Sequence, residues 1–262
     1  MLFLQLLFGI LILDSEVSSS LLSRSSIVGG QEALKGKWPW IAFIEIVRFN
    51  NRIENCDGTL ISDHWVLSAA HCFNKHDRLR DSKVTLGRYQ LSKPSNNEQV
   101  FSIRNVIVNG NFSDIMTGND IAVVELEGRA SLNGYVKPLA PQNLHTDFTR
   151  NSNCWLVGWG NMDSNVPLPE PRTLRNVNLP VLSKEECEDY WPVKGGMVCA
   201  GRGAVGGCSG DSGGPLVCEK ASHWVQVGLV SYGQANCSPP LKPTVFTQVS
   251  SYRNWIKKKT GV

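Results

Sequence analysis

The most informative stretch of this sequence is Gly207-Cys208-Ser209-Gly210-Asp211-Ser212-Gly213-Gly214-Pro215-Leu216. Three glycines closely surround Ser212, and because glycine adopts backbone conformations that other residues avoid, the chain can turn tightly here. Such a turn points several backbone N–H groups at one spot, where they can stabilise a developing negative charge. Ser212 is therefore a candidate nucleophile, provided that a base lies close to it.

Two upstream segments supply the residue types that a serine nucleophile needs. Ser68-Ala69-Ala70-His71-Cys72 places a histidine among small residues after an apolar run, and Gly118-Asn119-Asp120-Ile121-Ala122 places an acid directly before one. Taken alone, His71 is more often a structural histidine and Asp120 an ordinary turn aspartate. Together with Ser212 they form a set in which the base takes the serine proton and the acid orients the base.

In this order along the chain, the three segments resemble the trypsin-like (chymotrypsin-fold) serine proteases, from Ile27 to about Ile256. Subtilisin and the α/β-hydrolases arrange the same residue types in other orders. The start Ile27-Val28-Gly29-Gly30, the segment Lys37-Trp38-Pro39-Trp40 and the proline-rich loop before Leu174 are most similar to the tryptase-like branch. The resemblance implies an all-β fold of two six-stranded antiparallel β-barrels, with the active site between them and a C-terminal α-helix.

The residue pattern by itself also favours β-structure. Short apolar runs such as Trp65-Val66-Leu67 are interrupted by Gly, Pro, Asn and Asp, as is typical of strands and turns. Only Val249 to Lys259 spaces its apolar residues along one helical face. We expect one peptidase domain over residues 27–262, with two lobes that cover roughly residues 27–140 and 141–262.

The resemblance implies a role for each site residue. Ser212 would attack the scissile carbonyl, His71 would act as general base, and Asp120 would fix the imidazole tautomer. The amides of Gly210 and Ser212 would form the oxyanion hole. Ser231 matches the serine that hydrogen-bonds the buried aspartate in the family; the alternative interpretation is an ordinary strand residue.

The residues expected to form the substrate pocket are Gly206, Gly207, Tyr232, Gly233 and Thr244. Family members that cleave after Arg or Lys carry Asp where this chain has Gly206. This chain therefore has no acidic side chain at that position to pair with a basic side chain of the substrate. Thr244 stands where relatives with an open pocket have Gly. The sequence therefore predicts a preference for small or medium apolar side chains before the scissile bond.

Activation in the family requires a new N-terminal ammonium, here at Ile27, which pairs with Asp211. The usual basic residue before this position is displaced, because the chain contains Arg24-Ser25-Ser26-Ile27. Either another protease cuts after Ser26, or a dipeptidyl peptidase removes the Ser-Ser pair. A second departure is Asp57, which replaces the first glycine of the usual Cys-Gly-Gly. The sequence leaves open whether Asp57 perturbs the site or points to solvent.

The eight cysteines favour disulfides over a zinc site, because no Cys-x-x-Cys pair and no His partners stand at ligand spacing. The resemblance implies the pairs Cys56–Cys72, Cys154–Cys218, Cys187–Cys199 and Cys208–Cys237. Leu86-Gly87-Arg88 lacks the Glu of calcium-binding relatives, so we expect no metal and no cofactor.

The first residues indicate export. Residues 2–13 form an apolar run too short to span a bilayer comfortably, followed by Asp14 and Glu16, which is typical of a signal peptide. We expect a signal peptide at 1–19, an activation propeptide at 20–26, and a protein that is secreted or stored in secretory granules. Asn111-Phe112-Ser113 is a glycosylation sequon.

The expected partners are protein or peptide substrates, an activating protease, and serpin-type or other protein inhibitors. The net charge of +3 is too small and scattered to indicate a nucleic-acid partner, and no second apolar stretch has membrane-spanning length. The rival hypothesis is a catalytically silent homologue that acts as a binding or regulatory module. An ester hydrolase is disfavoured because its nucleophile motif needs an α/β fold.

Overall fold

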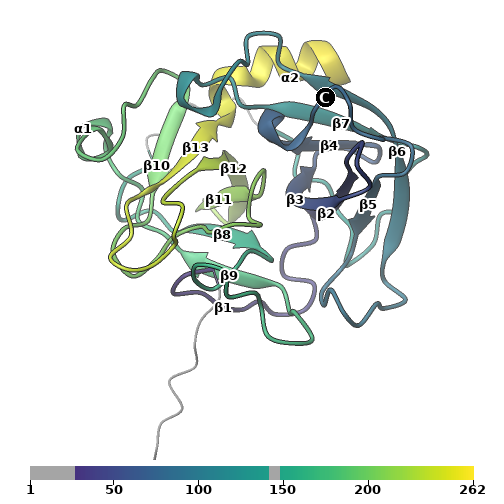
Figure 1. Ribbon diagram of the computed structural model, residues 1–262, viewed down its shortest axis with the longest axis horizontal. Helices are drawn as coiled ribbons and strands as arrows, with labels where there is room; N and C mark the ends of the chain where they lie inside the picture. Colours follow the sequence, from purple (N-terminus) through teal and green to yellow (C-terminus); the bar gives the residue numbers. More distant parts are fainter. Residues whose placement is uncertain (1–26, 142–147) are drawn as a thin grey trace, which may run out of the picture.

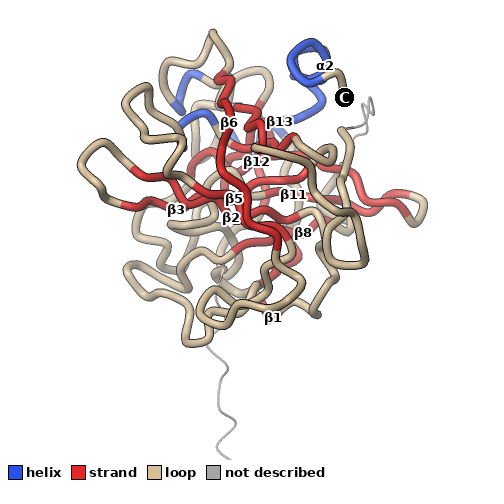
Figure 2. Tube along the Cα trace, turned by 90° about the vertical axis from the view of Figure 1, so that its right-hand side faces the viewer, coloured by secondary structure: helices blue, strands red, loops and turns tan. Residues whose placement is uncertain are grey.

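The computed structural model describes residues 27–141 and 148–262. The signal peptide and propeptide predicted for residues 1–19 and 20–26 lie outside these residues. The chain forms two β-structures side by side. The strands between residues 41 and 126 lie in one half of Figure 1, and the later strands, together with residues 31–32, lie in the other. Strands occupy the interior and loops surround them (Figure 2).

The first half is a closed antiparallel barrel in the strand order β2-β3-β4-β7-β6-β5. Its inward side chains are apolar, with Ile44, Val66 and Leu86 fully buried in one core cluster. Alternating burial along the strands leaves polar residues outside, as in β6, where exposed Arg104 follows buried Ile103. Its strands are β2 (Ile41–Val47), β3 (Ile53–Leu60), β4 (Trp65–Ser68), β5 (Lys83–Leu86), β6 (Gln99–Val108) and β7 (Ala122–Leu126).

The second half is a seven-stranded sheet in the order β1-β9-β8-β11-β12-β13-β10. The all-β, two-barrel prediction is confirmed, but this sheet has one strand more than the six expected. The extra strand is β1 from the N-terminal segment, where Gln31 pairs with Asn176. The strands are β1 (Gln31–Glu32), β8 (Cys154–Gly158), β9 (Arg175–Asn178), β10 (Met197–Ala200), β11 (Pro215–Lys220), β12 (His223–Tyr232) and β13 (Thr244–Gln248).

The helical elements are short. The predicted C-terminal helix begins as a 3₁₀ turn, η3 (Val249–Tyr252), and continues as α2 (Arg253–Thr260). Val249 and Ile256 are buried in a cluster with Leu67 and Val123 of the first barrel and Leu229 of the second sheet. The helix, drawn beside β7 in Figure 1, therefore packs against both halves. The other helices are η1 (Ala70–Cys72), η2 (Ile115–Thr117) and α1 (Lys184–Glu188).

All eight cysteines form disulfides, in the pairs that the family resemblance implied: Cys56–Cys72, Cys154–Cys218, Cys187–Cys199 and Cys208–Cys237. Two of them reinforce the segments that carry site residues, since Cys72 follows His71 and Cys208 precedes Ser212. None of the helices in the described part of the chain is long and apolar enough to cross a membrane.

Candidate active site

His71 and Asp120 meet at the barrel end where η1 and β7 begin. Asp120 Oδ2 lies 2.7 Å from His71 Nδ1, and Asp120 Oδ1 accepts a hydrogen bond of 2.8 Å from the backbone N–H of His71. The Asp120 side chain is fully buried, whereas the His71 side chain is 24% exposed. This two-point contact fixes the imidazole ring through Nδ1, so that Nε2 is the ring nitrogen not used by Asp120.

A third donor reaches Asp120 from the second sheet. Ser231 Oγ, on β12, donates to Asp120 Oδ2 at 2.5 Å, and Thr247 Oγ1 donates to the Asp120 backbone carbonyl at 2.8 Å. A carboxylate removed from water needs such donors, because burial without them is very costly. Ser231 therefore contacts the acid as predicted, and it links the two halves of the molecule at the site.

Ser212 lies on the nucleophile loop, defined here as residues 207–214. Gly210 and Gly213 adopt φ values of 100° and 75°, which side chains disfavour, so the glycine-rich turn expected from the sequence is present. The loop packs against the segment before His71, because a Cβ atom on Gly213 would overlap Ser68 Oγ and lie 3.0 Å from Ala69 N.

The described residues include no hydrogen bond between Ser212 Oγ and His71. Unliganded sites often leave this contact long, and it tightens when substrate binds. The backbone N–H groups of Gly210 and Ser212 have no protein acceptor within the described ranges. These two donors are consequently available to an oxyanion.

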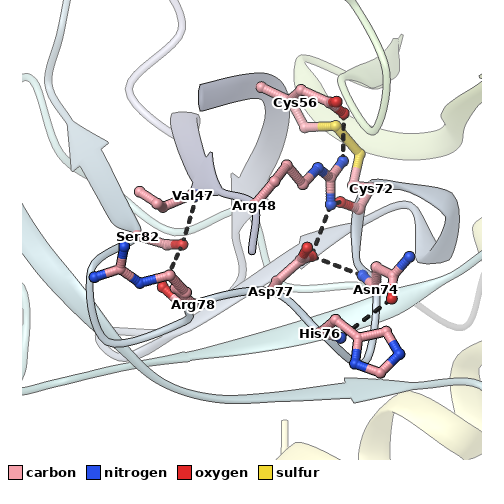
Figure 3. Close-up of polar contacts among 10 residues, drawn as sticks. Val47, Arg48, Cys56, Cys72, Asn74, His76, Asp77, Arg78 and Ser82 are labelled. Carbon is pink, nitrogen blue, oxygen red and sulfur yellow. Dashed lines mark hydrogen bonds and ion pairs between the residues drawn. A yellow bond between two sulfur atoms is a disulfide. The ribbon is translucent and has the colours of Figure 1, made fainter. Parts of the chain in front are cut away.

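The loop after His71 is anchored by Arg48, which follows β2 (Figure 3). The Arg48 guanidinium donates to the Cys72 carbonyl at 3.0 Å and to Asp77 Oδ2 at 2.7 Å, and it also pairs with Glu54 at 2.5 Å. Because Cys72 adjoins His71, this network holds the backbone that carries the candidate base. Sequence reasoning missed Arg48, since no motif marks it.

The predicted substrate pocket corresponds to a cavity of about 140 Å³ beside Ser212. Gly206 is not among its lining residues, and it lies behind Thr244, whose Oγ1 is 3.3 Å from the point where a Gly206 Cβ would stand. Thr244 Oγ1 also accepts a 2.9 Å hydrogen bond from Gly207 N–H. In the part of the chain that the structure describes, no charged side chain lines the cavity, whose walls are Gly207, Cys208, Ser209, Ser212, Val230, Ser231, Tyr232, Gly233, Gln234, Ala235, Cys237 and Thr244.

The residues expected to form the activation pair are both buried in the second half. Ile27 is completely buried, and the Val28 carbonyl accepts a 3.2 Å hydrogen bond from Gly206 N–H next to the nucleophile loop. The Asp211 carboxylate accepts hydrogen bonds of 2.9 Å from Gly160 N–H and from Cys208 N–H. Burial raises the pKa of Asp211 to about 7, although these two N–H donors oppose the shift.

The Asp57 side chain does not point to solvent. It is fully buried. Its carboxyl group and that of Asp211 both lie close to Gly158 and therefore close to each other. Burial, reinforced by the Asp211 charge, raises the pKa of Asp57 well above its ordinary value. The signal that could have indicated this was Gly158-Trp159-Gly160, because two glycines without side chains leave room for two carboxyl groups.

Comparison with known proteins agrees with this geometry. The family model described as Trypsin matches residues 27–256. Serine protease 41 of Homo sapiens is 36% identical over 246 residues, which cover 88% of this chain and 76% of that protein. Tryptase of Mus musculus is 35% identical over 250 residues, which cover 90% of this chain and 89% of that protein. The fold, the disulfide pairs and these matches together establish that the chain belongs to the trypsin family of serine proteases.

Proposed function

We propose that this chain is a secreted serine endopeptidase, made as an inactive precursor, that hydrolyses peptide bonds through an acyl-enzyme. The observation that carries the proposal is the buried Asp120 carboxylate, which contacts both the backbone and the ring of His71 and accepts a bond from Ser231. A carboxylate in this position fixes the imidazole tautomer and stabilises the imidazolium that forms during the reaction.

The reaction follows from this arrangement. Ser212 Oγ attacks the scissile carbonyl carbon while His71 Nε2 takes its proton, and the oxyanion is bound by the amides of Gly210 and Ser212. Collapse of the intermediate expels the amine, which receives the proton from His71. Water, deprotonated by His71, then attacks the acyl carbon. The second tetrahedral intermediate collapses with release of the acid product, and His71 returns the proton to Ser212 Oγ.

The cavity beside Ser212 supports a small or medium apolar side chain before the scissile bond. Its lining is uncharged, and Thr244 narrows it by lying close to Gly206, Gly207 and Gly233. An Arg or Lys side chain would lose its hydration there without gaining a buried partner charge, which is unfavourable.

Activation is proposed to require a free Ile27 ammonium that pairs with Asp211. The buried position of Ile27 and the pairing of Val28 with Gly206 support this, because a newly formed chain end would lie within the second half of the fold. An extracellular or granule location fits four disulfides and the similarity to tryptase. Asn111 is exposed and carries the proposed glycan.

Labelling with a fluorophosphonate probe tests the proposal against the rival of a catalytically silent homologue. Protein that begins at Ile27 should be labelled stoichiometrically, whereas Ser212→Ala should take up no label and should lose roughly 10⁴–10⁶-fold in peptide turnover. Both proteins should have the same circular dichroism spectrum. Absence of labelling in the Ile27 form would support the silent homologue.

A further inference from the structure

Two acidic side chains lie buried together behind the nucleophile loop, and the proposed function uses only one of them. Asp57, on β3, and Asp211 are both fully buried. The position that a Cβ atom would take on Gly158 is 2.5 Å from Asp57 Oδ2 and 2.5 Å from Asp211 Oδ1. The two oxygens are therefore no further apart than twice this distance, so the carboxyl groups are direct neighbours.

The hydrogen bonds of the two carboxyl groups differ. Asp211 accepts one bond of 2.9 Å at each oxygen, from Gly160 and from Cys208. Asp57 Oδ2 has one long contact of 3.4 Å with Trp159 N–H, and Asp57 Oδ1 has no partner among the described residues. Burying an ionised carboxylate without donors costs far more than burying a neutral acid. Asp211 therefore has the hydrogen-bond donors that an ionised carboxylate needs, whereas Asp57 lacks them.

The neighbouring elements offer Asp57 no compensating charge. Phe43 from β2, Ser68 from β4 and Trp159 after β8 all contact it, and none of them ionises in the range of interest. Arg88 lies over the Phe43 ring but pairs with two glutamates. Within residues 27–141 and 148–262, Asp211 is the charged group that acts on Asp57, and its charge is of the same sign.

We propose that Asp57 is a positioning residue that works as an uncharged acid: it keeps its proton in the folded enzyme, so that the Ile27 ammonium meets one negative charge, on Asp211. The inference rests on the proposed function, because it adds Asp57 to the same activation site. The Asp57 backbone N–H donates to the Ser212 carbonyl at 2.8 Å, which links the acid pair directly to the nucleophile.

The proton on Asp57 sets an upper pH limit for the active conformation. Its loss places two negative charges side by side in a water-poor site, with a single ammonium to offset them. Repulsion between them displaces the backbone that holds Ser212. The substitution Asp57→Asn keeps the volume and removes the titration, so the alkaline fall in activity moves to higher pH.

Equilibrium unfolding tests the proton without needing activity. The proteins begin at Ile27, carry Ser212→Ala, and have either Asp57 or Asp57→Asn. Between pH 6 and 8 the folding equilibrium constant should fall with rising pH more steeply in the Asp57 protein than in the Asp57→Asn protein, by up to tenfold per pH unit. The reason is that unfolding of the Asp57 protein releases one extra proton, from Asp57. Asp189→Asn, at the exposed end of α1, is the matched control and should leave the slope unchanged. Equal slopes in the Asp57 protein and in the Asp57→Asn protein overturn the proposal, whether or not the chain is a protease.

Two further measurements complete the test. The pH profile of kcat/KM for the Ile27 form should extend to higher pH in Asp57→Asn, and a uniform loss with an unchanged profile would mean a merely structural role. If Asp57→Asn does not fold, carboxyl ¹³C NMR of the aspartate-labelled Ser212→Ala protein takes the place of the comparison with that variant. One aspartate carboxyl should then stay protonated at pH 7. A spectrum in which every aspartate is ionised overturns the proposal. An inactive enzyme with the expected unfolding slope refutes only the proposed function.

Discussion

The pH dependence of stability should distinguish the chain that keeps Ser25 and Ser26 from the chain that begins at Ile27. Burial raises the pKa of Asp211 from 3.8 to about 7. Where the folded pKa lies above the unfolded value, the folded state holds an extra proton. The free energy of unfolding therefore decreases as pH rises from the unfolded pKa to the folded one. An ammonium at Ile27 beside Asp211 lowers this pKa and removes the decrease.

The size of the effect follows from the shift. The rise of the Asp211 pKa from 3.8 to about 7 corresponds to a change of about 4 kcal/mol in the free energy of unfolding. Between pH 5.5 and pH 7 the longer chain should lose about 2 kcal/mol more than the Ile27 form. If Asp57 keeps its proton over this range in both forms, as proposed, it contributes the same pH slope to both and cancels. Carboxyl groups with lowered pKa values, such as Glu54 and Asp63, change the free energy of unfolding mostly below pH 5.5, where they titrate.

Urea unfolding of both forms, each with Ser212→Ala to prevent autolysis and with disulfides intact, measures this difference. Asp211→Asn in the longer chain is the control, and it should remove the extra pH dependence. Identical pH slopes for the two chain starts would refute the reasoning. They would mean that Asp211 leaves its buried position in the longer chain, or that the ammonium never reaches it.

Three other predictions concern catalysis. Ser231→Ala removes a hydrogen bond to the charged Asp120, worth about 1.5–3 kcal/mol, so steady-state kinetics should show kcat reduced roughly ten- to a hundredfold. A peptide library should return Ala, Val or Leu before the scissile bond, and Thr244→Gly should shift the preference by about tenfold or more toward larger apolar residues; mainly Arg and Lys cleavage would contradict the uncharged pocket. Trypsin should cut after Arg24 and yield protein that does not titrate with an active-site reagent. Removal of the Ser-Ser dipeptide should restore titration, because the dipeptide places the ammonium about 7 Å away; full titration with the dipeptide attached would contradict the insertion mechanism.

Much of the site could be predicted because its residues lie in short motifs. The glycines that give the nucleophile loop its turn are contiguous with Ser212, and the contact between His71 and Asp120 follows from the resemblance. The disulfide pairs could be predicted in the same way. The strand count of the second sheet could not, because β1 has only two residues and its pairing depends on where β9 presents an open edge.

The direction of the Asp57 side chain was beyond sequence reasoning for a different reason. Both neighbours of Asp57 on β3 are buried, so alternation along the strand does not separate an inner from an outer face. The space that accepts the carboxyl is created by Gly158, in a segment about 100 residues further along the chain. Gly158 lies next to Asp57 only because the two halves of the molecule pack against each other.

This packing joins the proposed activation site and Ser212 in one hydrogen-bonded unit. Asp211 is the residue before Ser212, and its carboxylate is fixed by Gly160 and Cys208, while the Asp57 amide holds the Ser212 carbonyl. In the proposed mechanism, a change of one charge at either acid therefore acts on the amides of Gly210 and Ser212 through adjacent bonds. Since such donors must be placed to within a fraction of an ångström, a small displacement suffices to suppress catalysis. In this proposal, control of activity by a chain end needs no long-range conformational pathway. It also requires glycine at position 158, because a Cβ atom there would lie 2.5 Å from an oxygen of each acid.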